Sequence, residues 1–247
     1  QTSPATRVGI GEEFGMGAGA WAEGQMVTAL RMLGFNVVVD TNFSADLTIM
    51  EEGSELVERV THGGVLPQLT SCCPGWVKFV ELYYPELIPN LSSARSPMMM
   101  HGSTIKTYNA EKLGVPYQNI VNVAIMPCVA KKFEISREQF HGLESGAGVY
   151  YGDETVADMD YVLSVRELAN MIRQKLGDID FANLEEGTYD QIGTTAGLIF
   201  GNSGGVMEAA VRSAYFLITG SNPPELLYNL EPVRGLEGIK KASVEIP

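Results

Sequence analysis

The sequence predicts an α/β fold in which mostly parallel sheets are flanked by helices. Apolar, β-branched runs such as 36–40 and 121–126 are bounded by turn residues and alternate with segments of helical period. Such runs are typical of strands buried on both faces, and their alternation with helices is typical of parallel sheets. The length of 247 residues suits one large domain or two lobes.

The same patterns place the individual elements. Strands are expected at 7–10, 36–40, 68–72, 121–126, 160–165 and 242–246. Helices are expected at 20–33, 45–60, 75–84, 97–108, 129–133, 166–176 and 206–217. Residues 134–152 and 185–191 are rich in polar residues and glycine, and we expect them to be surface connections.

The cysteines are few, and their placement is unusual. Cys72 and Cys73 lie side by side in Thr-Ser-Cys-Cys-Pro-Gly-Trp at 70–76, and the third, Cys128, lies in Met-Pro-Cys at 126–128. Each motif follows an expected strand, and open α/β sheets place reactive groups at the carboxyl ends of their strands. Adjacent cysteines do not easily bridge each other, because a disulfide needs converging Cβ vectors.

Three interpretations of these thiols compete on the residues alone. They can be small buried hydrophobic side chains without chemistry. Cys73 can pair with Cys128 in a disulfide, although one thiol is then left over and nothing indicates a secreted scaffold. They can bind metal, but two cysteines about 55 positions apart are too few for a four-ligand site, so further ligands must come from elsewhere.

The residues around the cysteines resemble the first two signature motifs of the FeFe hydrogenase catalytic domain. These motifs are Thr-Ser-Cys-Cys-Pro-Gly-Trp at 70–76 and Met-Pro-Cys-Val-Ala-Lys-Lys-Phe-Glu at 126–134. Further stretches resemble the family in the same order, so that the resemblance covers nearly the whole chain: 11–15, 46–52, 83–87, 91–94, 199–201 and 204–210. The resemblance implies two lobes across residues 1–247, with the active site between them and a boundary that the sequence leaves open.

The resemblance also implies a cofactor, the H-cluster, in which a 4Fe-4S cluster is joined to a di-iron subcluster. Cys73 and Cys128 match ligands of the 4Fe-4S cluster. Without the resemblance, Lys131 would be interpreted as an ordinary surface lysine. In the resembling family, the matching lysine hydrogen-bonds a cyanide ligand of the di-iron unit through its ammonium group. The other positions that match the cofactor's surroundings are Pro4, Ala5, Pro97, Met126, Pro127 and Phe200. The glycines after Phe200 could alone indicate a phosphate site, but their spacing fits neither nucleotide motif.

Proton transfer is the second implied task. Glu52 and Glu55 share one face of an expected helix with Arg59, a pattern that most often marks a solvated stripe of ion pairs. In the resembling family, the positions matching Glu52, Glu55 and Ser92 form a proton path to the thiol matching Cys72. Carboxylates, hydroxyls and thiols within hydrogen-bond reach are what proton movement through an interior requires.

The chain departs from the family in three places. The family's third motif supplies two more cluster cysteines, and the sequence contains only three cysteines in all. We therefore expect the catalytic domain to be incomplete at its C-terminus, and a C-terminal segment or a second chain to supply these ligands. Met98 stands where a glutamine is common, and Ala5 stands where a serine is common, so polar contacts near the di-iron unit are expected to be fewer.

The charge limits the partners. A formal net charge of −13 disfavours nucleic acid and anionic membrane surfaces, which reward clusters of Lys and Arg. No apolar run approaches the ~18 residues of a spanning helix, and no signal-peptide pattern opens the sequence. Together with the low cysteine count, this favours the cytoplasm.

The function implied is reversible oxidation of H2 and reduction of protons, with electrons exchanged with ferredoxin or another carrier. A hydrogenase-like sensor or iron–sulfur assembly protein is the alternative, although the doubled Cys72-Cys73 pair counts against both. A third possibility is one half of a split hydrogenase, which the missing cysteines favour.

Overall fold

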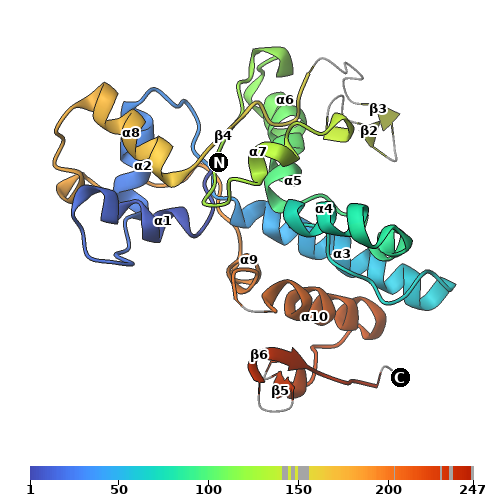
Figure 1. Ribbon diagram of the computed structural model, residues 1–247. Coiled ribbons are helices and arrows are strands. Elements are labelled where there is room, and N and C mark those ends of the chain that lie inside the picture. The colour runs from blue at the N-terminus through green and yellow to red at the C-terminus, as the bar shows by residue number, and fades with distance from the viewer. Residues whose placement is uncertain are drawn as a thin grey trace. The chain divides into compact units, whose positions relative to one another are not determined.

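The computed structural model describes residues 1–140, 144–145, 148–149, 156–202, 204–228, 230–233 and 236–245. The chain forms two compact units (Figure 1). Unit 1 comprises Gln1–Phe43 and Met98–Ile192, and unit 2 comprises Ser44–Pro97 and Gly193–Pro247. No helix in the described ranges is long and apolar enough to span a membrane.

A parallel sheet lies at the centre of unit 1 and confirms the predicted α/β class. Strands β1 (Val123–Ile125) and β4 (Tyr161–Leu163) pair in parallel. Single parallel bridges extend the arrangement from Ile125 to Thr2, from Thr2 to Asp40 and from Val39 to Gln191. The strand expected at 36–40 therefore forms only these bridges at its end.

The prediction of a strand at 7–10 is wrong. Thr6–Gly9 is a short helix, α1, and the residues inserted into the sheet are those just before it. Thr2 N–H donates to Val39 O at 3.1 Å, and Ser3 N–H donates to Ile125 O at 3.0 Å. One helical turn brings Arg7 and Ile10 to the same buried face, where Arg7 pairs with Glu23 and Asp40.

The main core of unit 1 packs helices α2 (Glu23–Met32) and α8 (Val165–Leu176) beside the sheet. A capping box between Ser164 and Glu167 starts α8. A second apolar cluster is rich in methionine and contains Met98, Met99, Ala124, Met126, Met159 and Val162.

The helix expected at 97–108 is present but irregular. It comprises α5 (Pro97–Thr104), a π-helical turn (Ile105–Asn109) and α6 (Ala110–Leu113). The buried ammonium of Lys106 in this turn pairs with Asp160 at 2.8 Å. The remaining elements described between Gln1 and Ile192 are short: η1 (Gly11–Phe14), η4 (Tyr117–Asn119), α7 (Lys131–Glu134), η5 (Glu138–Phe140), β2 (Glu144–Ser145), β3 (Gly148–Val149) and η6 (Phe181–Asn183).

Unit 2 is mainly helical. Its elements are most of α3 (Asn42–His62), α4 (Pro74–Tyr83), η2 (Pro85–Asn90), α9 (Thr195–Ile199), α10 (Gly205–Thr219), η7 (Glu225–Leu227), β5 (Glu231–Val233) and β6 (Leu236–Lys241). The strand expected at 68–72 is reduced to one parallel bridge between Leu69 and Leu91. The last expected strand is wrong for 242–245, which follow β6 without regular structure, and residue 246 lies outside the described residues.

Close packing in unit 2 depends on glycine. A Cβ placed on Gly53 of α3 would lie 3.3 Å from the carbonyl oxygen of Ala210 in α10, so these two helices approach at small residues. At the start of α10 the space is tighter still, because a Cβ on Gly205 would lie 1.8 Å from the Ile199 carbonyl oxygen. The α9–α10 turn therefore requires glycine at this position.

We expect Gly205→Ala to lower the free energy of unfolding by on the order of 3 kcal/mol, because the backbone must move to admit the methyl group. Gly201→Ala is the matched control in the same turn, since its Cβ would meet Leu198 O at an ordinary 3.6 Å. Urea denaturation of the two variants checks this, and equal midpoints would contradict the close approach.

Candidate functional site

The cysteine pair lies at the amino end of α4. Cys73 caps this helix in an extended conformation, and its Sγ accepts a hydrogen bond from the Trp76 backbone N–H at 3.4 Å. Cys73 is exposed and Cys72 is partly buried, and neither forms a disulfide. The two thiols therefore occupy different surroundings.

Glu52 of α3 is the most perturbed acid near this pair. Its side chain is 1% exposed, and in the part of the chain that the structure describes neither carboxyl oxygen has a hydrogen bond of ordinary geometry. Burial and, to a smaller extent, the charge of Glu55 raise the pKa of Glu52 to about 7, although the Ser71 backbone N–H lowers it in part. Glu52 can therefore both hold and release a proton near neutral pH.

Glu55, one turn further along α3, is in the opposite state. Ser92 Oγ donates to its Oε2 at 2.5 Å, Arg59 Nη2 donates to its Oε1 at 2.7 Å, and the Ser93 backbone N–H donates to Oε2 at 3.0 Å. Burial alone would raise the pKa of Glu55, but the hydrogen bonds of Ser92 and Arg59 outweigh it and lower the pKa. Glu55 is therefore a stable carboxylate.

Arg59 is a functional residue that the sequence analysis placed on this face without giving it a role. Besides holding Glu55, its guanidinium donates to the backbone carbonyl oxygens of Val65, Pro89, Asn90 and Leu91. It thereby ties α3 to the segment before the cysteine pair and to the segment carrying Ser92. The spacing of four between Glu55 and Arg59 was the available signal.

Unit 1 carries a second group of the predicted residues. Cys128 is exposed, forms no disulfide, and follows β1. Because Thr2 and Ile125 bridge in parallel, Pro4 and Ala5 leave the sheet at the same edge as Pro127 and Cys128. Met126 is 4% exposed and packs in the methionine-rich cluster.

Lys131 begins the short helix α7 just after Cys128. Its Nζ pairs with the Glu134 carboxylate at 2.7 Å, and Glu134 is 4% exposed. This pairing fixes the position of the ammonium in a largely buried place. Glu134, which belongs to the motif but was not assigned a role from the sequence, is thus the partner that positions Lys131.

The last predicted residues lie in unit 2. Phe200 follows α9 and is partly buried, and α9 itself is capped by Thr194, which is held by Asp46. Pro97 is the first residue of α5. Its neighbour Met98 is 1% exposed and packs among other methionines, so the position that is often glutamine in the resembling family is here part of the apolar core.

The predicted residues are thus gathered into two groups, one in each unit. Unit 2 holds Cys72, Cys73, Glu52, Glu55, Ser92, Pro97 and Phe200, and unit 1 holds Cys128, Lys131, Met126, Pro127, Pro4 and Ala5. Among the described residues no set of three or more His, Cys, Asp or Glu side chains is arranged to bind a metal. The thiols alone therefore do not complete a metal site in this sequence.

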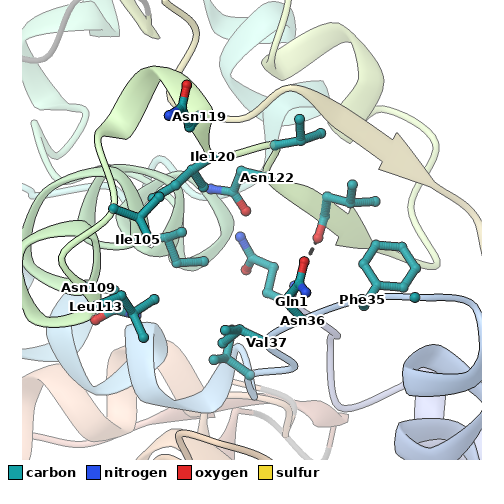
Figure 2. A pocket seen from close by; sticks show the side chains of 15 residues that line it. Gln1, Phe35, Asn36, Val37, Ile105, Asn109, Leu113, Asn119, Ile120 and Asn122 are labelled. Atoms are coloured by element: carbon teal, nitrogen blue, oxygen red, sulfur yellow. Dashed lines mark hydrogen bonds between the residues drawn. The ribbon is translucent and has the colours of Figure 1, made fainter.

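A cavity of about 550 Å³ in unit 1 is separate from these residues (Figure 2). It lies at the amino ends of the parallel segments, whereas Cys128 lies at their carboxyl ends. Apolar side chains such as Val37 and Ile105 line it together with the amides of Gln1, Asn109 and Asn122. None of the predicted site residues borders this cavity.

Comparison with known proteins gives a consistent result. All 247 residues match the family model described as "Iron only hydrogenase large subunit, C-terminal domain". The chain is 45% identical to the periplasmic [Fe] hydrogenase large subunit of Nitratidesulfovibrio vulgaris, covering 99% of this chain and 56% of that protein. It is 46% identical to iron hydrogenase 1 of Clostridium pasteurianum, covering 99% of this chain and 40% of that protein.

A solved structure of an [FeFe]-hydrogenase from Chlamydomonas reinhardtii superposes with a TM-score of 0.80 at 46% identity, covering 97% of this chain and 58% of that one. A more distant relative is the cytosolic Fe-S cluster assembly factor narfl of Danio rerio, 30% identical over 92% of this chain and 55% of that protein. The chain spans about half the length of the curated relatives it matches.

The two carboxylates should respond to pH in opposite directions. The pKa of Glu52 in the folded state, about 7, lies above its ordinary 4.5. Between these two pH values the folded state binds a proton that the unfolded state lacks, so the free energy of unfolding falls as pH rises through this window. Glu52→Gln should therefore gain stability over wild type from about pH 5 to about pH 8, by on the order of 3 kcal/mol.

Glu55→Gln is the comparison variant. Because the pKa of Glu55 is lowered in the folded state, its carboxylate stabilises the fold at pH values above the ordinary pKa of a glutamate, and this stabilisation is lost as pH falls. This variant should be less stable than wild type at neutral pH, and the difference should shrink in acid. Urea unfolding across the pH range measures both, and parallel curves for wild type and both variants would contradict the assignment.

Proposed function

Because the chain belongs to the iron-only hydrogenase large-subunit family, we propose that it forms part of an FeFe hydrogenase that interconverts H2 with protons and electrons. The observation that carries this proposal is the pair of acids with opposite electrostatics on α3, one of which, Glu52, interacts with the backbone N–H of Ser71, the residue before Cys72. Glu52 exchanges a proton near neutral pH, and Glu55 is held as a carboxylate that accepts from Ser92. This set of groups suits proton transfer to a buried reaction centre.

In this proposal each group has one role. Ser92 and Glu55 form the outer hydrogen-bonded pair, Glu52 is the buried proton carrier, and Cys72 delivers the proton to the cofactor. The Ser71 backbone N–H, which interacts with the Glu52 carboxyl, belongs to the residue just before Cys72, and this supports the order. Arg59 is a positioning residue, because it holds Glu55 and the surrounding backbone.

The donor set fits an iron–sulfur cofactor. Cys73 and Cys128 are exposed thiols outside any disulfide, and soft thiolates are the usual ligands of such clusters. When bound, the H-cluster supplies electron transfer through its 4Fe-4S part and hydrogen chemistry at its di-iron part. Lys131, fixed by Glu134, would hydrogen-bond a diatomic ligand of the di-iron unit, with Pro4, Ala5, Pro97, Met126, Pro127 and Phe200 forming its surroundings.

The cubane needs four ligands, and Cys72 is assigned to proton transfer. We therefore place the two further cysteines in polypeptide outside these 247 residues, either a C-terminal segment of the domain or a second chain. The count of three cysteines and the share of the relatives that the chain spans support this. We further propose ferredoxin or a similar protein as the electron carrier. We also propose the cytoplasm as the compartment, and because one relative is named periplasmic, cell fractionation is the test of this.

The second candidate function is non-catalytic iron–sulfur assembly, favoured by the more distant relative of that name. The proton-transfer set in unit 2 distinguishes the two, because an assembly factor has no need of a buried acid that titrates near neutral pH. Iron content and infrared spectra of the complete gene product after anaerobic maturation test the assignment. Bands of metal-bound carbon monoxide and cyanide support the hydrogenase, and their absence in an iron-loaded protein supports assembly.

Cys72→Ala separates proton delivery from cofactor binding. We expect this variant to keep the infrared bands of the cofactor and to lose H2 production by about 100-fold or more, because a positioned proton carrier contributes on this scale. Cys73→Ala is the matched control at the adjacent position, and it should lose the cluster itself. A Cys72→Ala protein with unchanged activity would contradict the proton path.

A further inference from the structure

The backbone N–H of Trp76 is directed at the sulfur of Cys73. The nitrogen lies 3.4 Å from Sγ, and it belongs to the first turn of the ten-residue helix α4. Pro74 opens this turn without an N–H, and the Val77 N–H bonds the Cys73 carbonyl oxygen at 3.0 Å. The Trp76 amide is therefore a donor of this turn that bonds the thiol.

The side chain of the same residue forms a second, separate hydrogen bond. Trp76 Nε1 donates to the Thr70 carbonyl oxygen at 3.1 Å. Trp76 thus forms two hydrogen bonds in this segment. Its backbone N–H donates to the sulfur of Cys73, and its indole N–H donates to Thr70, which precedes the cysteine pair.

We propose that Trp76 is a positioning residue whose backbone N–H···S bond raises the reduction potential of the iron–sulfur cluster that Cys73 ligates. This inference rests on the proposed function. Reduction adds an electron, and part of the added negative charge spreads onto the thiolate sulfurs. A donor aimed at one of these sulfurs therefore stabilises the reduced cluster more than the oxidised one. The amino end of α4 acts in the same direction.

Two substitutions of the same residue separate the amide from the indole. Trp76→Pro removes both donors, and proline is tolerated in the first turn of a helix. Trp76→Phe removes only the indole N–H and keeps the backbone N–H. The measurement is a redox titration of the cluster signal by electron paramagnetic resonance in the complete, matured gene product.

We expect the midpoint potential of Trp76→Pro to be clearly more negative than that of wild type, with Trp76→Phe close to wild type. Equal potentials in the two variants would overturn the inference, because the amide would then have no influence on the cluster.

A second measurement avoids any failure of the proline variant to fold. In protein labelled with tryptophan that carries ¹⁵N only at its backbone nitrogen, the reduced cluster of wild type should show a ¹⁵N hyperfine coupling that disappears in labelled Trp76→Phe. The phenylalanine variant keeps the bond but loses the label, so it excludes Trp21 and any other tryptophan as the source. A wild-type spectrum without this coupling would overturn the inference.

The outcomes also separate this inference from the function it rests on. A wild-type protein that forms no cubane would overturn the ligand role of Cys73 and this inference together. A cubane that forms but responds neither to Trp76→Pro nor to the label would overturn this inference alone.

Discussion

One guanidinium, that of Arg59, ties together the segments of unit 2 that surround Glu55. It is anchored in α3, bonds the Glu55 carboxylate one turn away, and donates to the backbone carbonyls of Val65, in the segment after α3, and of Asn90 and Leu91, at the end of η2. Those segments lead to the cysteine pair and to Ser92. Because the carbonyls would otherwise lack these partners, the position of the segments and the charge of Glu55 depend on the same side chain.

The contrast between Glu52 and Glu55 follows from this arrangement. Two carboxyls three residues apart on one helix have the same intrinsic chemistry, yet the donors around them are divided unequally. Glu55 takes the hydroxyl of Ser92 and the guanidinium of Arg59, while Glu52 is left in a buried place with the Ser71 amide nearby. Burial without donors favours the protonated acid, and donors favour the carboxylate.

In unit 1 the comparable constraint is parallel strand pairing. Thr2 lies between Asp40 and Ile125, so the turns that follow these residues all emerge at one edge of the sheet. Pro4 and Ala5 therefore leave the sheet at the same edge as the Cys128 motif, although more than a hundred residues separate them in the chain. The methionine-rich cluster then fixes Met126 beneath this edge, which leaves Cys128 exposed and Met126 buried.

The sequence by itself determined the α/β class, the long helices α2, α3, α4, α8 and α10, and the family, because apolar periodicity and the spacing of the two cysteine motifs are local properties. Only the tertiary structure decided that residues 6–9 form a helix and that Gln1–Ser3 enter the sheet, since strand pairing depends on distant partners. It alone also decided which glutamate has a raised pKa and which a lowered one, because hydrogen-bond donors from Ser92 and Ser93 reach Glu55 only when the chain is folded.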